Sequence, residues 1–389
     1  MLKDEYIFQE MLEQKKIAAL HKTLPRPNWP PVAEHIILTG SGDSHCAALF
    51  AQWVLAEKGK VSALPALEAS QVARSLHSKD LLITISVSGR TARVLEAAQR
   101  ALAQGAHVVA VTDNVNSPLA ALASEIWPIY ASPCEELFET KYIDENAKQY
   151  VGYHHDVAQT KTFWATLLTL IRAAAVRLDW QSLLSHTRCL LSPSFYEPLL
   201  NKGTLYAKSG QTFFLGSGWA KIIARFASYK MYEFNRIAHF TGIEEYCHTH
   251  YFITRPGDTV VFLITDDDVA CRAVEVIPVL CKLFEARIIW LQSGPLNPQI
   301  SPTISSYHLE VVKTPSTDRD WQLFFDLLLG VQWLTYSIGR IDAPNINTFH
   351  AGYDTERLVA GSLITVRKST IRATRKRESG KGRKNSNSD

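Results

Sequence analysis

The sequence predicts an α/β protein with two parallel β-sheets, each flanked by helices. Short branched apolar runs alternate with helical segments of about a dozen residues, a pattern typical of βαβ units. Three landmarks also recur at nearly constant offsets of 176, 178 and 180 residues, so one unit occurs twice within 389 residues. The paired landmarks are residues 40–42 and 216–218, 79–85 and 257–264, and 105–109 and 285–289.

The predicted organisation has four parts. Residues 1–30 read as a short helical lead that ends at a group of prolines. Residues 31–190 and 191–365 carry the two copies of the unit, and residues 366–389 form a basic tail with nine Lys or Arg against two acidic residues. The tail lacks apolar periodicity, which favours a disordered, solubilising segment. Weak nonspecific contact with nucleic acid through this tail is the alternative.

The first predicted strand, residues 35–39, runs into a glycine-bearing turn at residues 40–44 and then into a helix over residues 47–56. Neighbouring parallel strands deliver such turns to the same carboxyl edge of a sheet, where open α/β sheets bind ligands. The glycine spacing matches neither a dinucleotide fingerprint nor a P-loop, so it excludes both of these nucleotide sites.

A second loop of this kind follows the apolar run at residues 81–85. Ser86, Ser88, Gly89 and Thr91 lie between this run and a segment with helical periodicity. Backbone N–H groups and hydroxyls at the start of a helix suit a dianionic phosphate, and a glycine lets the backbone pass close to it. The alternative is that the hydroxyls only cap the helix.

The second copy differs at the equivalent loop. It carries Asp266, Asp267 and Asp268, whose charges would repel a phosphate although they suit the start of a helix. A helix cap explains them better than a magnesium site, which would need ligands from elsewhere. We therefore expect one phosphate-binding site per chain, no metal and no cofactor.

Successive motifs of this chain resemble those of the sugar isomerase (SIS) domain, in the same order, from about residue 30 to about residue 365. The resemblance implies two tandem SIS domains, each a three-layer αβα unit. It is strongest to the branch that holds the isomerase half of glucosamine-6-phosphate synthase and the stand-alone bacterial tagatose- or galactosamine-6-phosphate isomerases and deaminases. The motifs are 42–44, 68–70, 86–91, 111–120 and 158–163.

The resemblance also implies site residues. Glu233 matches the carboxylate that moves a proton between C1 and C2, and Glu245 and His248 match a loop element whose histidine opens the sugar ring. A carboxylate of raised pKa and a neutral imidazole suit these tasks. The residues expected to bind the substrate are Ser44, Ser86, Ser88, Gly89, Thr91, Thr160 and Lys161.

Each catalytic assignment has an alternative. Glu233 could pair with Lys230 or Arg236 on a helix surface. Cys247, His248 and His250 could ligate zinc, and His250 could take the role of His248, since the Gly-Pro that often follows the family's histidine is missing here. Lys161 could be a surface charge at the start of a helix.

The implied function is that of a phosphosugar isomerase or amino-sugar phosphate deaminase that works through an enediol or enolamine intermediate. A fructosamine-6-phosphate deglycase shares this intermediate, and a noncatalytic sugar-phosphate-binding regulator is an alternative from another class. Residues 1–30 are too short for a glutaminase and lack an N-terminal nucleophilic cysteine. We therefore expect no ammonia from glutamine.

The resemblance implies a homodimer in which the loop of Glu245 and His248 completes the partner's site. Aromatic side chains around this loop suit such an interface, and an internal core is the alternative. No apolar run reaches the length of a membrane span, and no signal-peptide pattern is present. The six cysteines show no paired spacing, which indicates that they are reduced and mostly buried. We expect a cytoplasmic protein. The aromatic residues are Tyr229, Tyr232, Phe234, Phe240, Tyr246, Tyr251 and Phe252.

Overall fold

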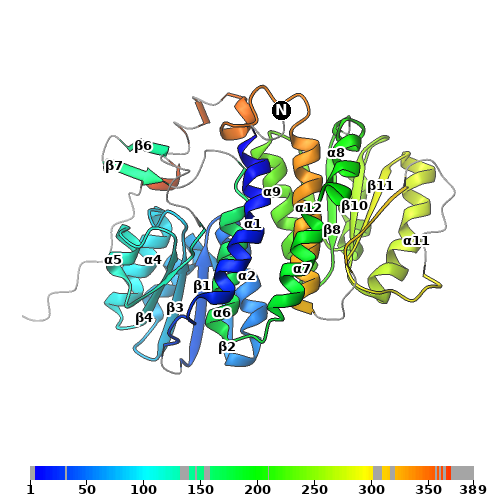
Figure 1. Cartoon of the computed structure of the whole chain (residues 1–389). Coiled ribbons are helices and arrows are strands. Elements are labelled where there is room, and N and C mark those ends of the chain that lie inside the picture. The colour runs from blue at the N-terminus through cyan, green and yellow to red at the C-terminus, as the bar shows by residue number, and fades with distance from the viewer. Residues whose placement is uncertain are drawn as a thin grey trace, which may run out of the picture.

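Two parallel five-stranded sheets lie on either side of a central layer of helices in the computed structural model (Figure 1). This confirms the predicted α/β class with two sheet-containing units. The part of the basic tail beyond residue 368 lies outside the described residues. The structure describes residues 5–30, 33–131, 140–144, 147–152, 158–208, 210–300, 309–315, 320–354, 357–358, 361 and 365–368.

The two sheets have the same strand order relative to the chain. The first strand of each half lies between the second and third, and the fourth and fifth strands follow outward. The first sheet has the order β2-β1-β3-β4-β5 and consists of β1 (His35–Gly40), β2 (Lys60–Pro65), β3 (Asp80–Ile85), β4 (His107–Thr112) and β5 (Glu125–Pro128). The second has the order β12-β11-β10-β8-β9 and consists of β8 (Thr212–Gly216), β9 (Ala238–Thr241), β10 (Thr259–Ile264), β11 (Arg287–Gln292) and β12 (Leu309–Lys313).

Strand side chains alternate between two hydrophobic cores, because successive residues of a strand point to opposite faces. In β3, Leu81 and Ile83 belong to the central core between the sheets, whereas Leu82 belongs to an outer core. In β10, Val261 lies in the central core and Phe262 in the other outer core. Burial on both faces explains why these strands read as continuous apolar runs.

The central layer joins both halves of the chain. Its N-terminal helix α1 packs against α6 and α7, and Gln14 of α1 donates a hydrogen bond to Gln332 of α12 (2.6 Å). The predicted helical lead is thus a buried part of the fold. The helices of the layer are α1 (Tyr6–Thr23), α2 (Asp43–Val54), α6 (Lys161–Ala174), α7 (Trp180–Leu190), α8 (Pro193–Ala207), α9 (Ala220–Glu233) and α12 (Asp320–Gly339).

Shorter layers cover the outer faces of the sheets, and a separate antiparallel pair of strands lies between β5 and α6. The outer face of the first sheet carries α3 (Ala66–Val72), α4 (Ala92–Ala103) and α5 (Pro118–Leu122). The outer face of the second sheet carries α10 (Ile243–His248) and α11 (Asp267–Phe284). The antiparallel strands are β6 (Thr140–Asp144) and β7 (Ala147–Gly152).

Of the five described cysteines, all are unpaired, but only Cys46 is buried, so the expectation that most are buried was wrong. Among the described helices, none combines the length and apolar character needed to cross a membrane.

Candidate active site

The first loop at the carboxyl edge is shaped by two glycines. A side chain at Gly40 would overlap Ser44, and Gly42 adopts a φ of +56°, which favours glycine. The chain therefore turns tightly from β1 into α2, and Asp43 and Ser44 form the first turn of the helix. Gly216 and Gly218 show the same two features at the end of β8.

The second loop, residues 86–91, lies beside the first because β1 and β3 are neighbouring parallel strands. The hydroxyls of Ser86 and Thr91 are hydrogen-bonded to each other at 3.1 Å. Gly89 has a φ of +63°, and a side chain there would overlap Ser117. The predicted substrate-binding hydroxyls thus converge on one edge of the sheet.

Helix capping does not account for the hydroxyls of this loop. Thr91 holds the N-cap position of α4 but makes no side-chain cap hydrogen bond. Ser88 Oγ accepts a hydrogen bond from the backbone N–H of Arg90 (3.3 Å), within the loop itself. The loop therefore presents hydroxyls beside the start of a helix, an arrangement that suits an anion.

A buried lysine from the second half joins this edge to Glu233. The ammonium of Lys230, which is 1% exposed, lies 2.7 Å from Asp43 Oδ2 and 2.8 Å from Glu233 Oε2, and donates to the carbonyl of Gln159 (3.0 Å). We call Lys230, Asp43 and Glu233 the Lys230 cluster. The alternative that Glu233 pairs with Lys230 is thus confirmed. This pair does not lie on a helix surface, however, because Lys230 is buried and contacts the other half of the chain.

Arg236, the other suggested partner of Glu233, binds elsewhere. Its guanidinium donates to the carbonyls of Ala207 (3.1 Å) and Ile341 (2.5 Å).

The cluster changes the pKa of its members. Desolvation raises the pKa of Glu233 to about 7, the positive charge of Lys230 opposes this rise, and the carboxylate of Asp43 adds to it. Burial favours the neutral form of Lys230, but Asp43 and Glu233 outweigh it and raise the pKa of Lys230 above its usual value. Lys230 is therefore charged at neutral pH, while Glu233 can exchange a proton near pH 7.

Thr160 and Lys161, at the start of α6, are held by carboxylates of α1. The backbone N–H of Thr160 donates to Glu10 (3.1 Å), and the ammonium of Lys161 lies 2.9 Å from Glu13. Lys161 is 0% exposed, so the alternative of a surface charge was wrong. Thr160 adjoins the carbonyl of Gln159 that binds Lys230, which brings this element to the Lys230 cluster.

Two buried oxygens beside the cluster have no hydrogen-bond partner within the described part of the chain. They are Oδ1 of Asp43 and Oγ1 of Thr160. Buried polar atoms are usually paired, so unpaired ones need an explanation. A polar ligand bound at this edge would supply partners to both.

Glu245 and His248 do not join the cluster within one chain. They lie on α10, whose Ile243 and Tyr246 pack in the outer core of the second sheet. His248 is exposed and bound to Glu244 (3.2 Å), and Glu245 is exposed. Within the described ranges, no hydrogen bond or ion pair joins either residue to Lys230 or Glu233.

The suggested zinc ligands Cys247, His248 and His250 also fail to converge. Among the described residues, the one group of three or more His, Cys, Asp or Glu side chains close enough to share a metal ion lies at the start of β1 and β3. Nδ1 of His250 is instead hydrogen-bonded to the hydroxyl of Thr249 (2.8 Å).

The seven aromatic residues around α10 differ in their burial. Phe234 and Tyr246 are buried in the chain's own cores. Tyr232 and Phe252 are 44% and 78% exposed, next to the exposed Ile237 and Ile253. Tyr229, Phe240 and Tyr251 are half-buried, so Tyr232 and Phe252 offer the most aromatic surface to a partner.

Three features of the site escaped the sequence analysis. Lys230 was considered only as a surface partner of Glu233, Asp43 only as part of a motif, and Glu10 not at all. The spacing Lys-x-x-Glu on one helix face was the available signal for Lys230. Nothing local connects Asp43 or Glu10 to residues more than a hundred positions away.

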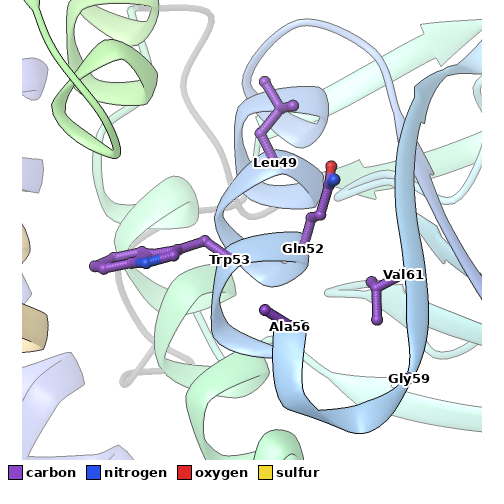
Figure 2. A pocket seen from close by; sticks show the side chains of 6 residues that line it. All are labelled: Leu49, Gln52, Trp53, Ala56, Gly59 and Val61. Atoms are coloured by element: carbon purple, nitrogen blue, oxygen red, sulfur yellow. The ribbon is translucent and has the colours of Figure 1, made fainter.

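A hollow of about 330 Å³ is lined by residues of α2 and β2 and of the turn between them (Figure 2). Trp53 and Gln52 line it. The side-chain carbonyl of Gln52 accepts a hydrogen bond from the backbone N–H of Ala63 (3.0 Å). None of the predicted site residues lines it, so it is separate from the Lys230 cluster.

The comparisons with known proteins agree with this fold. Residues 32–172 match the family model of the SIS domain. A 179-residue stretch is 31% identical to glutamine--fructose-6-phosphate aminotransferase [isomerizing] of Pyrococcus horikoshii. This stretch is 43% of the chain but only 26% of that relative's length.

Solved structures extend the likeness of the fold to both halves. The C-terminal domain of glucosamine-fructose-6-phosphate aminotransferase from Francisella tularensis has a TM-score of 0.68, at 15% identity, over 89% of this chain and 98% of that one. Tagatose-6-phosphate ketose/aldose isomerase from Escherichia coli has a TM-score of 0.66, at 16% identity, over 89% and 95%. Glucosamine-6-phosphate deaminase from Thermotoga maritima has a TM-score of 0.58, at 16% identity, over 86% and 93%.

Proposed function

We propose that the SIS domain at residues 32–172 and the sheet that follows it form a phosphosugar isomerase or deaminase, which acts on a ketose or amino-sugar 6-phosphate. The observation that carries the proposal is the Lys230 cluster. It holds a carboxylate with a pKa near 7 beside the edge where two hydroxyl-bearing loops meet. The names of the relatives, all enzymes of sugar phosphates, support the substrate class.

The proposed roles follow from the positions of the residues. Ser44, Ser86, Ser88, Gly89 and Thr91 bind the phosphate through hydroxyls and backbone N–H groups. Thr160 and Lys161 shape the sugar pocket, the former with its unpaired hydroxyl and the latter through its ion pair with α1.

Glu233 is the proposed base. Its ionised carboxylate takes a proton from C1 of a ketose, the electron pair moves into the enediol, and the same group returns the proton to C2. Lys230 keeps Glu233 oriented. In a deaminase Glu233 would take the proton from C2 of the amino sugar and return it to C1, and water would hydrolyse the resulting C2 imine to a ketone and ammonia, so one base serves both reactions.

The test of the function is a panel of sugar and amino-sugar 6-phosphates incubated with the protein in deuterated water. We expect one of them to acquire deuterium at C1 or C2 as product forms. Release of an amino acid from a fructosamine 6-phosphate would assign the deglycase activity instead. Saturable binding with no exchange from any compound would favour a sugar-phosphate-binding regulator.

Ser88→Ala is expected to weaken binding of the phosphorylated ligand about 10-fold to 100-fold, because a hydrogen bond to a charged group is worth about 1.5–3 kcal/mol. Calorimetric titration with the sugar 6-phosphate measures it. Ser194→Ala, an exposed hydroxyl on α8, is the matched control and should bind as the unmodified protein does. Equal affinities in both variants would remove residues 86–91 from the phosphate site.

The proposed assembly is a homodimer with composite sites. Glu245 and His248 lie apart from the Lys230 cluster in their own chain, while exposed Phe252 and Ile253 follow them directly. In a dimer the α10 loop of one chain would reach the Lys230 cluster of the other, and His248, or His250 in its place, would open the sugar ring there with Glu245 beside it.

A mixing experiment tests the composite site. Glu233→Gln and His248→Ala chains are each expected to be inactive, and their mixture to regain up to about a quarter of the activity, since some hybrid dimers hold one intact site. Subunit exchange is verified with differently tagged chains. Complete exchange without recovery would place both residues in the site of one chain.

A further inference from the structure

A second group of chemically active side chains lies at the opposite edge of the first sheet. His35 is the first residue of β1, Asp80 is the first residue of β3, and His77 lies in the turn before β3. The two strands are parallel neighbours, with His35 paired directly to Asp80. Since β1 runs from His35 to Gly40, this group lies about 17 Å along the strand from the phosphate-binding loops.

The three side chains converge on one point. Each oxygen of the Asp80 carboxylate faces one imidazole, with Nδ1 of His35 3.0 Å from Oδ1 and Nδ1 of His77 3.4 Å from Oδ2. One ligand atom from each residue can be chosen so that all three lie within 4.8 Å of one another. Zinc bonds of about 2.0–2.2 Å place neighbouring ligand atoms roughly 3.3–3.5 Å apart in a tetrahedral site.

The backbone holds the carboxylate in place while the imidazoles stay accessible. Asp80 is 3% exposed, and its Oδ2 accepts the backbone N–H of His77 (2.9 Å). The side chains of His35 and His77 are 43% and 52% exposed. A fixed carboxylate with two reachable imidazoles is a partly formed ligand shell.

The Asp80 carboxylate supplies the negative charge of the group. Glu34 adds a second carboxylate nearby, and its charge is balanced by Lys79, whose ammonium lies 2.8 Å away. The Asp80 carboxylate is left without a lysine or arginine partner in the ion pairs that the described residues form. A hollow of about 680 Å³ opens beside it, lined by His35, His77 and Asp80, so water can reach the group.

We propose that His35, His77 and Asp80 bind a divalent transition-metal ion, for which Zn²⁺ is the representative. Two imidazoles and one carboxylate are a donor set that suits zinc and its neighbours rather than calcium or magnesium. The hollow leaves the remaining coordination position to water. The ion would link the starts of β1 and β3 to the turn that precedes β3, and this inference does not depend on the proposed isomerase site.

Titration of the metal-depleted full-length protein with Zn²⁺, followed by calorimetry, tests the site. We expect the double variant His35→Ala/His77→Ala to bind one equivalent fewer than the unmodified protein, and His77→Ala alone to bind that equivalent at least 10-fold more weakly. His107→Ala is the matched control, since His107 begins the neighbouring strand β4 at the same edge but lies outside the cluster. It should retain full stoichiometry.

Thermal unfolding gives a second readout, because a ligand that binds only the folded state raises the unfolding temperature. Zn²⁺ should raise that of the unmodified protein and of His107→Ala more than that of the double variant, and all three should unfold alike in the presence of a chelator. Equal stoichiometry and equal Zn²⁺-induced shifts in the double variant would overturn the proposal and leave the group as a hydrogen-bonded cluster only.

Discussion

Glu233→Gln is expected to lower kcat by a factor of about 10²–10⁴, the usual contribution of a positioned general base, with a much smaller effect on KM. The amide keeps the size of the side chain and can still contact Lys230, but it cannot accept a proton from carbon. Steady-state rates with the substrate found in the deuterium screen measure the loss. Deuterium exchange into that substrate should fall by the same factor.

The pH profile adds a test of the same residue. Because desolvation raises the pKa of Glu233 to about 7, kcat should fall as the pH drops through 7, where the carboxylate becomes protonated and can no longer act as a base. The ordinary pKa of Glu lies near 4.3, so an unshifted base would stay active well below pH 6.

Glu275→Gln is the matched control for both measurements. Glu275 is also paired three residues along a helix with a cation, Arg272 (2.6 Å), but on an exposed surface. It should leave rate and pH profile unchanged. A Glu233→Gln protein that keeps its rate, or a profile flat down to pH 5, would exclude Glu233 as the base.

Lys230→Met is expected to lower the free energy of unfolding by about 3 kcal/mol or more, because loss of one member of a buried ion pair leaves its partners uncompensated. Asp43 and Glu233 would then face each other as like charges without their shared cation. The pKa of Glu233 should rise further, and the pH at which kcat is half-maximal should move upward. Urea unfolding and the pH profile measure the two effects.

Two further variants separate charge from packing. Lys221→Met, on the exposed face of the same helix, should leave both quantities unchanged. The double variant Lys230→Met/Asp43→Asn should recover part of the lost stability, since it removes one of the two uncompensated carboxylates. If the double variant is less stable than Lys230→Met, the cost comes from lost packing and not from unpaired charge.

The sequence by itself determined the features that depend on neighbouring residues. The apolar runs at 35–39 and 81–85 predicted strands β1 and β3, and the glycines and hydroxyls after them predicted the two loops at the carboxyl edge. These signals are local, because a strand, a tight turn and the helix after it are specified by consecutive side chains and their φ preferences. The nearly constant offset between the two halves likewise predicted two copies of one unit, and two five-stranded sheets are present.

Only the tertiary structure decided which charged side chains meet. Lys230 and Asp43 are 187 residues apart, and Lys161 and Glu13 are 148 apart. Such pairs form because the central layer packs α9 against α2 and α6 against α1. Burial then forces each charge to find a partner, since an unpaired charge in the interior is costly. His35, His77 and Asp80 meet for a related reason, because parallel pairing of β1 and β3 aligns the starts of two strands that lie 45 residues apart in the chain.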